Sequence, residues 1–337
     1  MSGKKNRLAA GLAALLGALA LFGGCTESGL TKVTVNEVTH SVFYAPQYAA
    51  MELGYFEEEG IEIDLVNGGG SDKSMTALLS GDADIGLMGP ETAVYVYNEG
   101  REDHAVIIGQ LTKRDGSLLL GKEPDEDFSW QKLRGKTVIG GRQGGMPQMT
   151  LEYVLKQNGL EPGVDVNVRT DIQFNLMAGA FESSDSEYVT LFEPSASLAE
   201  REGVGYIVAA VGDESGDVPY TAYMVLKSKV EENAGLYERY LRAVYRGQQW
   251  VATHTPAEIA SVIAPQFPDS DVELLTRVAE NYQRIGAWTE TPVMTEEMFE
   301  RMLDIIGEAG ELSGRPEFDA LVDNSIAHKV SEEQPAG

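Results

Sequence analysis

The chain has 337 residues, a formal net charge of −27 and a single cysteine. So strong a negative charge repels nucleic-acid phosphates and anionic lipid head groups, which argues against both as partners of the folded body. One cysteine excludes an internal disulfide, and the four histidines lack the spacing of metal ligands, so we expect no metal site.

The first 25 residues have the pattern of a secretory signal peptide. Three basic residues precede an apolar run over residues 8–22, and two glycines then lead into Cys25. This run is too short to stay in a membrane as a spanning helix. Residues 22–25 resemble the lipobox of bacterial lipoproteins, whose cysteine is acylated after export and becomes the new N-terminus. The alternative is a signal peptide with a chance cysteine near its end.

From residue 32 onward, segments typical of strands alternate with segments typical of helices. In chain order, the pattern predicts a strand (32–38), a helix (46–58) broken at Gly54, a strand (61–66), a helix (72–79), a strand (83–88), a helix (90–98) and two strands (106–111 and 117–120). It then predicts a strand (137–139), a helix (147–157), a strand (164–169), a helix (177–182), a strand (188–191), a helix (194–200) and two strands (206–211 and 220–226). Beyond residue 233 the chain is mostly helical, with a capping box at Thr255 and Glu258 and a capping residue at Thr295.

This repetition of strand–helix units predicts two α/β lobes with mostly parallel sheets. The second lobe is expected as an insertion between two chain crossings, near residues 111–117 and 219–223, which together form a hinge beside a cleft. The expected units are a signal peptide (1–24), a tether (25–31), a first lobe (32–112 and 224–337) and a second lobe (113–223).

Five loops directly follow predicted strands, where a cleft between α/β lobes meets its ligand. They are residues 40–48, 67–72, 89–92, 140–147 and 192–194. The glycines in two of these loops allow backbone N–H groups to face a ligand, although tight connections need glycine as well. Arg142 is the one cation in the five loops, and a surface ion pair is its alternative role.

The motifs of common enzymes are missing. Loop 140–147 has neither the Gly-Lys-Ser/Thr ending of a P-loop nor the glycine spacing of a dinucleotide site. No G-x-S-x-G nucleophile elbow is present. Glu91 and Glu193 form a conceivable carboxylate pair across the cleft, but acceptance of ligand hydrogens or helix capping is the simpler role. We therefore expect a binding protein without a cofactor, with an enzyme acting on a pyrimidine-like substrate as the alternative.

Three segments carry a resemblance to a known family. FYAPQYAAMELGYFEEEGI (43–61), ALLSGDADIG (77–86) and KLRGKTV (132–138) resemble the sulfonate/nitrate/thiamine-precursor family of solute-binding proteins. The resemblance implies a type II periplasmic-binding-protein fold that closes on a small molecule. It also implies a monomer outside the cytoplasm that works with an ABC permease and ATPase and touches the membrane through its lipid anchor alone. The thiamine-synthesis enzymes of this superfamily need a cysteine-rich motif, and a chain without cysteine beyond Cys25 does not belong to that branch.

Residue by residue, the family's first-lobe contacts map onto Tyr44, Ser71 and Thr92. Its second-lobe contacts map onto Gly144, Gly145, Met146 and Glu193. Combined with the loops after strands, the predicted ligand-binding residues are Phe43, Tyr44, Ser71, Glu91, Thr92, Arg142, Gly144, Gly145, Met146, Phe174 and Glu193.

Two ligand classes stay open. A sulfonate, nitrate or similar anion would be held by hydroxyls and helix N-termini, which Ser41 and the glycine loops supply. A heteroaromatic ligand, such as a thiamine pyrimidine precursor, would use stacking rings and carboxylates that accept amino hydrogens. The candidate stacking rings are Phe43, Tyr44, Phe174, Phe192 and Trp288, and the candidate acceptors are Glu91 and Glu193. This surplus of aromatic and acidic residues favours the heteroaromatic class.

Overall fold

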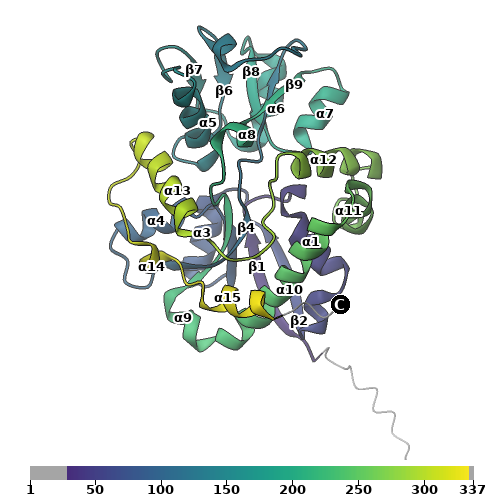
Figure 1. The fold of residues 1–337 in the computed structure, drawn as a ribbon, viewed down its shortest axis with the longest axis vertical. Coiled ribbons are helices and arrows are strands. Elements are labelled where there is room, and N and C mark those ends of the chain that lie inside the picture. The colour runs from purple at the N-terminus through teal and green to yellow at the C-terminus, as the bar shows by residue number, and fades with distance from the viewer. Residues whose placement is uncertain (1–28, 334–337) are drawn as a thin grey trace, which may run out of the picture.

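The computed structural model describes residues 29–333, so the predicted signal peptide and Cys25 lie outside the described residues. Two five-stranded sheets, each flanked by helices, form two lobes that are stacked along the long axis of the molecule (Figure 1). The predicted two-lobed α/β architecture is therefore confirmed. Among residues 29–333, no helix has both the length and the apolar character needed to cross a membrane.

The first sheet has the strand order β2-β1-β3-β10-β4. Its strands are β1 (Thr31–Glu37), β2 (Ile61–Asn67), β3 (Ile85–Met88), β4 (Ala105–Thr112) and β10 (Thr221–Leu226). All eight residues of β4 are buried, as expected for an apolar strand that is covered on both faces. β10 begins at Thr221, three residues before the expected return of the chain at residue 224.

Helices surround this sheet. They are α1 (Ala45–Glu52), α2 (Tyr55–Glu58), α3 (Ser71–Ser80), α4 (Glu91–Asn98), α9 (Lys227–Glu232), α10 (Ala234–Thr253), α11 (Pro256–Ile263), α12 (Val272–Arg284), α13 (Glu296–Glu308), α14 (Phe318–Leu321) and α15 (Ser325–Glu332), with short 3-10 helices η1 (Val42–Tyr44) and η4 (Ala264–Gln266). Two of these helices, α12 and α13, also pack against helices of the second lobe. The predicted break of helix 46–58 at Gly54 is confirmed, because Gly54 adopts a left-handed conformation, with φ of 75°. The predicted capping box of Thr255 and Glu258 is confirmed.

The second sheet has the order β7-β6-β8-β5-β9. Its strands are β5 (Leu118–Gly121), β6 (Thr137–Ile139), β7 (Asn167–Arg169), β8 (Tyr188–Leu191) and β9 (Tyr206–Ala210). Its helices are α5 (Met146–Gln157), α6 (Met177–Ser183), α7 (Ser195–Arg201) and α8 (Val211–Ser215), with η2 (Trp130–Leu133) and η3 (Phe174–Leu176). β7 is shorter than predicted because residues 161–166 form hydrogen-bonded turns that leave Val164 81% exposed.

The expectation of mostly parallel sheets is wrong, because both sheets are mixed. β10 is antiparallel to β3 and β4, and β5 is antiparallel to β8 and β9. Each of these strands is the first one that the chain forms after crossing from the other lobe. A strand that enters from the opposite side of its sheet runs against its neighbours, and this direction is not encoded in strand periodicity.

The two crossings lie side by side and are bonded to each other. The backbone N–H of Val218 donates to the carbonyl of Lys113 at 2.8 Å, and that of Tyr220 donates to Thr112 at 3.2 Å. Arg114 also forms an ion pair with Asp217, with 2.6 Å between Nε and Oδ1. These bonds make the hinge a paired segment rather than two independent linkers.

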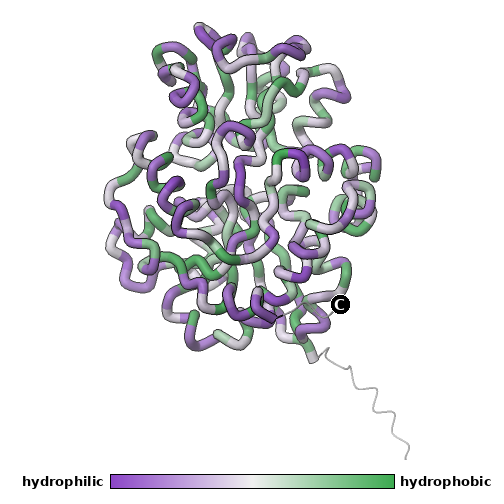
Figure 2. Tube along the Cα trace, viewed as in Figure 1, coloured by the Kyte–Doolittle hydropathy of each residue, from purple (hydrophilic) through white to green (hydrophobic). Residues whose placement is uncertain are grey.

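The helices present one apolar side to the sheets, so green and purple stretches alternate along them in Figure 2. α10 approaches α1 closely at Gly247, where an added Cβ would lie 2.1 Å from the carbonyl oxygen of Pro46 and 3.0 Å from Cβ of Ala50. Only glycine permits this approach of the two backbones.

Gly247→Ala is therefore expected to lower the free energy of unfolding by about 1–2 kcal/mol, after allowing for alanine's better helix propensity. Urea denaturation measures this loss. Gly235→Ala in the same helix is the matched control, because a Cβ there meets nothing within 4 Å. Equal stability of the two variants would contradict the close packing.

Candidate ligand-binding site

A cavity of about 370 Å³ lies where loops of the two lobes meet, within the range of small-molecule sites. It is bordered by residues from segments 38–44, 67–73, 89–91, 141–147, 173–177, 190–192 and 220–221. Each of the five loops named from the sequence contributes at least one residue. Most of these segments follow the carboxyl ends of strands, which is why loops distant in sequence converge here.

Eight of the eleven predicted residues line this cavity. They are Phe43, Tyr44, Ser71, Glu91, Arg142, Gly145, Met146 and Phe174. Thr92, Gly144 and Glu193 do not line it, and their polar groups bind other parts of the protein.

Thr92 and Gly144 hold the loops that border the cavity. The Thr92 hydroxyl donates to the carbonyl of Gly89 at 2.7 Å. The backbone N–H of Gly144 donates to Oε1 of Gln148 at 2.9 Å, and its carbonyl accepts from the Tyr95 hydroxyl at 3.1 Å. Because Tyr95 belongs to α4, this last bond joins the first lobe to the second.

Glu193 links α7 to α12. Its carboxylate accepts from the backbone N–H of Ser197 at 2.9 Å, from the Ser197 hydroxyl at 2.7 Å and from the Asn281 amide at 2.6 Å. Burial raises the pKa of Glu193, and these hydrogen bonds oppose the rise. The carboxylate thus caps the first turn of α7, and it borders a smaller neighbouring cavity.

An aromatic cluster forms one wall of the main cavity. The Phe43 ring is its centre, with centroids 5.8 Å from Tyr44, 5.6 Å from Phe192, 5.7 Å from Tyr220 and 5.1 Å from Tyr282. These distances are typical of edge-to-face and tilted aromatic pairs. The wall combines rings of the first lobe, the second lobe and the hinge.

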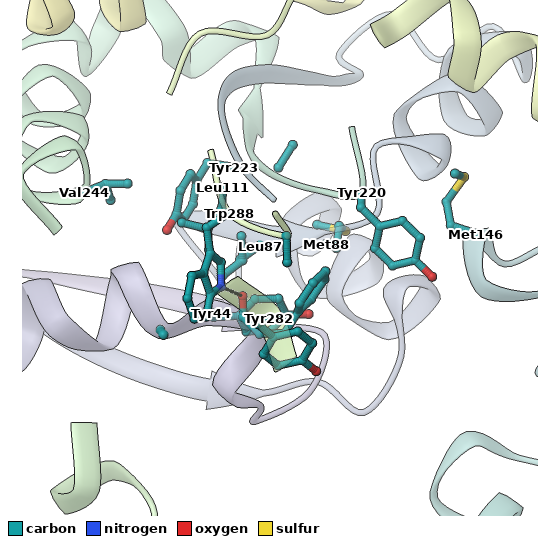
Figure 3. Packing of buried hydrophobic residues seen from close by; sticks show 14 of the residues in the cluster. Tyr44, Leu87, Met88, Leu111, Met146, Tyr220, Tyr223, Val244, Tyr282 and Trp288 are labelled. Atoms are coloured by element: carbon teal, nitrogen blue, oxygen red, sulfur yellow. Dashed lines mark hydrogen bonds between the residues drawn. The ribbon is translucent and has the colours of Figure 1, made fainter. Parts of the chain in front are cut away.

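Trp288, which the sequence offered as a stacking ring, lies behind this wall (Figure 3). Its indole Nε1 donates to the carbonyl of Phe43 at 2.9 Å, and it does not border the cavity. It supports the backbone at Phe43. Its place beside Phe43 depends on long-range packing that no local pattern reveals.

Glu91 is the buried acid of the cavity. It is the first residue of α4, is 2% exposed, and its Oε2 has no hydrogen-bond partner among the described residues. Burial raises the pKa of Glu91 to about 7, while the charge of Arg142 and the Met146 N–H partly oppose the rise. An unpartnered buried oxygen is costly, and a ligand N–H or a cation would satisfy it.

The cations of the cavity lie at its rim. Arg142 is exposed and approaches Asp72 of α3, with 3.7 Å between Nη2 and Oδ1. Such an exposed pair contributes little to stability. Lys73 also borders the cavity and is exposed. The interior therefore offers rings and a carboxylate, and positive charge is confined to the opening.

Two residues of the second crossing that the sequence did not predict as site residues also border the cavity, Tyr220 and Thr221. Tyr220 and Asp115, which belongs to the first crossing, are both buried and adjacent: burial raises the pKa of the Tyr220 hydroxyl, and the Asp115 carboxylate raises it further. Burial raises the pKa of Asp115 to about 7. The predicted hinge was the available signal, because a hinge beside a cleft also provides part of the cleft's floor.

Two α/β lobes joined by two crossings, with a cavity between them, define the architecture of the periplasmic-binding-protein class. The model of the NMT1-like family matches residues 31–264, and the chain belongs to that family. YtlA of Bacillus subtilis (strain 168), which carries a provisional name as a binding protein, is 42% identical over 308 residues, covering 91% of this chain and 92% of that protein.

Solved structures share the fold at low identity. A ligand-binding component of an ABC-type import system from Staphylococcus aureus superposes with a TM-score of 0.71 at 14% identity, over 90% of this chain and 100% of that one. The alkanesulfonate-binding protein SsuA of Xanthomonas axonopodis pv. citri gives 0.70 at 14%, over 87% and 98%. The periplasmic nitrate-binding protein NrtA of Synechocystis PCC 6803 gives 0.69 at 15%, over 91% and 90%. The predicted fold is confirmed by these likenesses.

Proposed function

We propose that this protein is the extracytoplasmic solute-binding subunit of an ABC importer, which captures a small organic ligand and delivers it to a permease. The family membership, the relative named as a binding protein and the importer components among the structural neighbours support this function. A cavity built by both lobes suits a protein that closes on its ligand. Binding alone, without catalysis, is sufficient for such a role.

The proposed location is the outer face of the cell membrane. The cationic start, the apolar run and Cys25 support export followed by lipid attachment. The first strand begins at Thr31, so only a short segment separates Cys25 from the folded lobes. A tether of this length would keep the protein near its permease.

The proposed ligand is an amine-bearing heteroaromatic molecule, such as a pyrimidine. The single observation that carries this proposal is the unpartnered Oε2 of Glu91 beside an aromatic wall. An amino group on a flat ring would donate to this oxygen while the ring packs against Tyr44 and Phe43. Both interactions form at once when the ligand ring lies flat against the aromatic side chains and its amino group is directed toward α4.

A small anion such as a sulfonate or nitrate is the second candidate. The N-terminus of α3, preceded by Gly69 and Gly70, borders the cavity together with Arg142 and Lys73. Helix N-termini and cations favour anions. An anion that reaches the interior would meet Glu91, however, and this is why the amine-bearing class ranks first.

A thermal-shift panel of aminopyrimidines, sulfonates and nitrate separates these candidates, since a bound ligand raises the melting temperature. Aminopyrimidines are expected to stabilise the protein most. A larger shift from an anion would favour the second candidate, and turnover of any ligand by the pure protein would favour the alternative of an enzyme.

Tyr44→Ala is expected to weaken binding of the best panel ligand by about 1–3 kcal/mol, because Tyr44 provides part of the ring surface. Isothermal titration calorimetry measures the change. Tyr97→Ala on α4 removes a ring that does not border the cavity and serves as the control. An unchanged affinity in Tyr44→Ala would place the ligand elsewhere.

A further inference from the structure

A second cavity of about 250 Å³ adjoins the first. Seven residues border both cavities, among them Phe174, Thr190 and Phe192. The two spaces therefore meet along one edge of the aromatic wall. A single water needs only about 10–15 Å³, so the second cavity has room for a group of several heavy atoms.

The charged groups that border the second cavity are already engaged. His40 has Nδ1 2.7 Å from Oε1 of Glu37 and Nε2 2.8 Å from the carbonyl of Gln266. The Glu193 carboxylate is bonded to Ser197 and Asn281. No lysine or arginine is among its described lining residues.

Neutral polar groups are free in the same place. The side chains of Thr39, Asn175 and Ser195 border the second cavity and form no hydrogen bond within residues 29–333. Hydroxyls and a primary amide both donate and accept hydrogen bonds. These are the groups that pair with the hydroxyls of a ligand, whereas a phosphate or carboxylate would meet Glu193 with no lysine or arginine to balance it.

We propose that one elongated ligand occupies both cavities, with an aminated heteroaromatic ring in the first and a neutral hydroxylated substituent, such as a pentosyl or polyol chain, in the second. This inference rests on the proposed function, because it assumes that the first cavity holds such a ring. It adds that specificity among ring-containing ligands is decided by Thr39, Asn175 and Ser195. The heteroaromatic ring of the ligand then packs against aromatic side chains of both lobes, and the substituent of the ligand extends toward the start of α7.

The test uses matched probes: cytosine with cytidine, adenine with adenosine, and the two 5′-monophosphates. Their affinities for the purified protein are measured by calorimetry, supported by melting temperatures. At least one riboside is expected to bind about tenfold more tightly than its base, as two or so neutral hydrogen bonds allow. The corresponding monophosphate is expected to bind more weakly than the riboside.

Ala178→Leu is the diagnostic variant, because Ala178 on α6 borders the second cavity and not the first. It is expected to abolish the advantage of the riboside and leave the affinity for the base unchanged. Ala180→Leu on the same helix borders neither cavity and is the matched control. The melting temperatures of the unliganded variants confirm that both fold.

The possible failures are distinct. If bases bind as tightly as their ribosides, the two-cavity inference is overturned and the proposed function stands. If Ala178→Leu weakens base and riboside equally, the second cavity does not hold the substituent. If no base or riboside binds, the aminated heteroaromatic proposal is overturned, and this inference falls with it.

Discussion

Replacing Glu91 by glutamine is expected to weaken binding of an amine-bearing ligand by about 2–4 kcal/mol, or roughly 30-fold to several hundred-fold. Glu91 borders the cavity, its carboxylate is buried and its Oε2 is unpartnered, so a ligand donor that reaches this oxygen gains a charge-assisted hydrogen bond. Glutamine keeps the shape and loses the charge. Calorimetry measures the loss, and Asp72→Asn is the control, since Asp72 is an exposed carboxylate that pairs with Arg142 and does not border the cavity.

The same variant has a second signature in its pH dependence. Because the pKa of Glu91 in the folded protein is about 7, the carboxyl is largely protonated at pH 5 and ionised at pH 8. Affinity of the native protein for the amine should therefore rise over this interval, and Glu91→Gln should remove the rise. A pH profile identical in the two proteins would show that Glu91 does not face the ligand.

Glu91 should also reduce stability at higher pH. Its pKa is raised above the ordinary value of 4.5, so the folded state binds a proton that the unfolded state has lost, and stability falls as pH rises from about 4.5 to 7. Glu91→Gln should thus make the unliganded protein more stable at pH 8, by up to about 3 kcal/mol. Higher stability with lower affinity distinguishes a binding group from a structural one.

Phe43→Ala is expected to lower the free energy of unfolding by about 3–5 kcal/mol. The ring is 2% exposed and contacts rings from both lobes, and an added Cβ on Gly116 of the hinge would lie 2.5 Å from it. Removing the ring leaves a void beneath the hinge and the cavity wall. Urea denaturation gives the magnitude.

Phe174→Ala is the matched control for this prediction. Phe174 borders the same cavity but is 46% exposed, so its removal should cost less than about 1 kcal/mol. Equal losses in the two variants would show that the ring at 43 does not join the lobes.

Local patterns identified the elements well. All ten predicted strands form, because alternation and short apolar runs reflect burial in a sheet. The glycine at 54 and the cap at Thr255 depend on the backbone within one turn, so they too are visible in the sequence. By contrast, β7 is shorter than predicted because residues 161–166 form turns. The apolar Val164 made this segment look like part of the strand, although its side chain is exposed.

The candidate site was predictable where a side chain follows a strand. Ser71, Glu91 and Met146 occupy such positions, and all three reach the cavity. Glu193 follows a strand as well, but its acceptors are bonded to Ser197 and to Asn281, which is 88 residues away in the sequence. Whether a buried acid serves a ligand or the protein depends on partners that only the folded chain brings near.

The sequence by itself determined the two α/β lobes, the loops that border the cavity and the family. The lobes follow from the periodicity of apolar residues, the loops from their place after strands, and the family from short characteristic segments. Each of these signals lies within a short stretch of the chain. Only the tertiary structure decided that both sheets are mixed, that Tyr220 of the hinge borders the cavity, that Glu91 has an unpartnered oxygen and that a second cavity adjoins the first. Each of these depends on contacts between segments far apart in the chain, and such contacts are set by how the two crossings direct one lobe against the other.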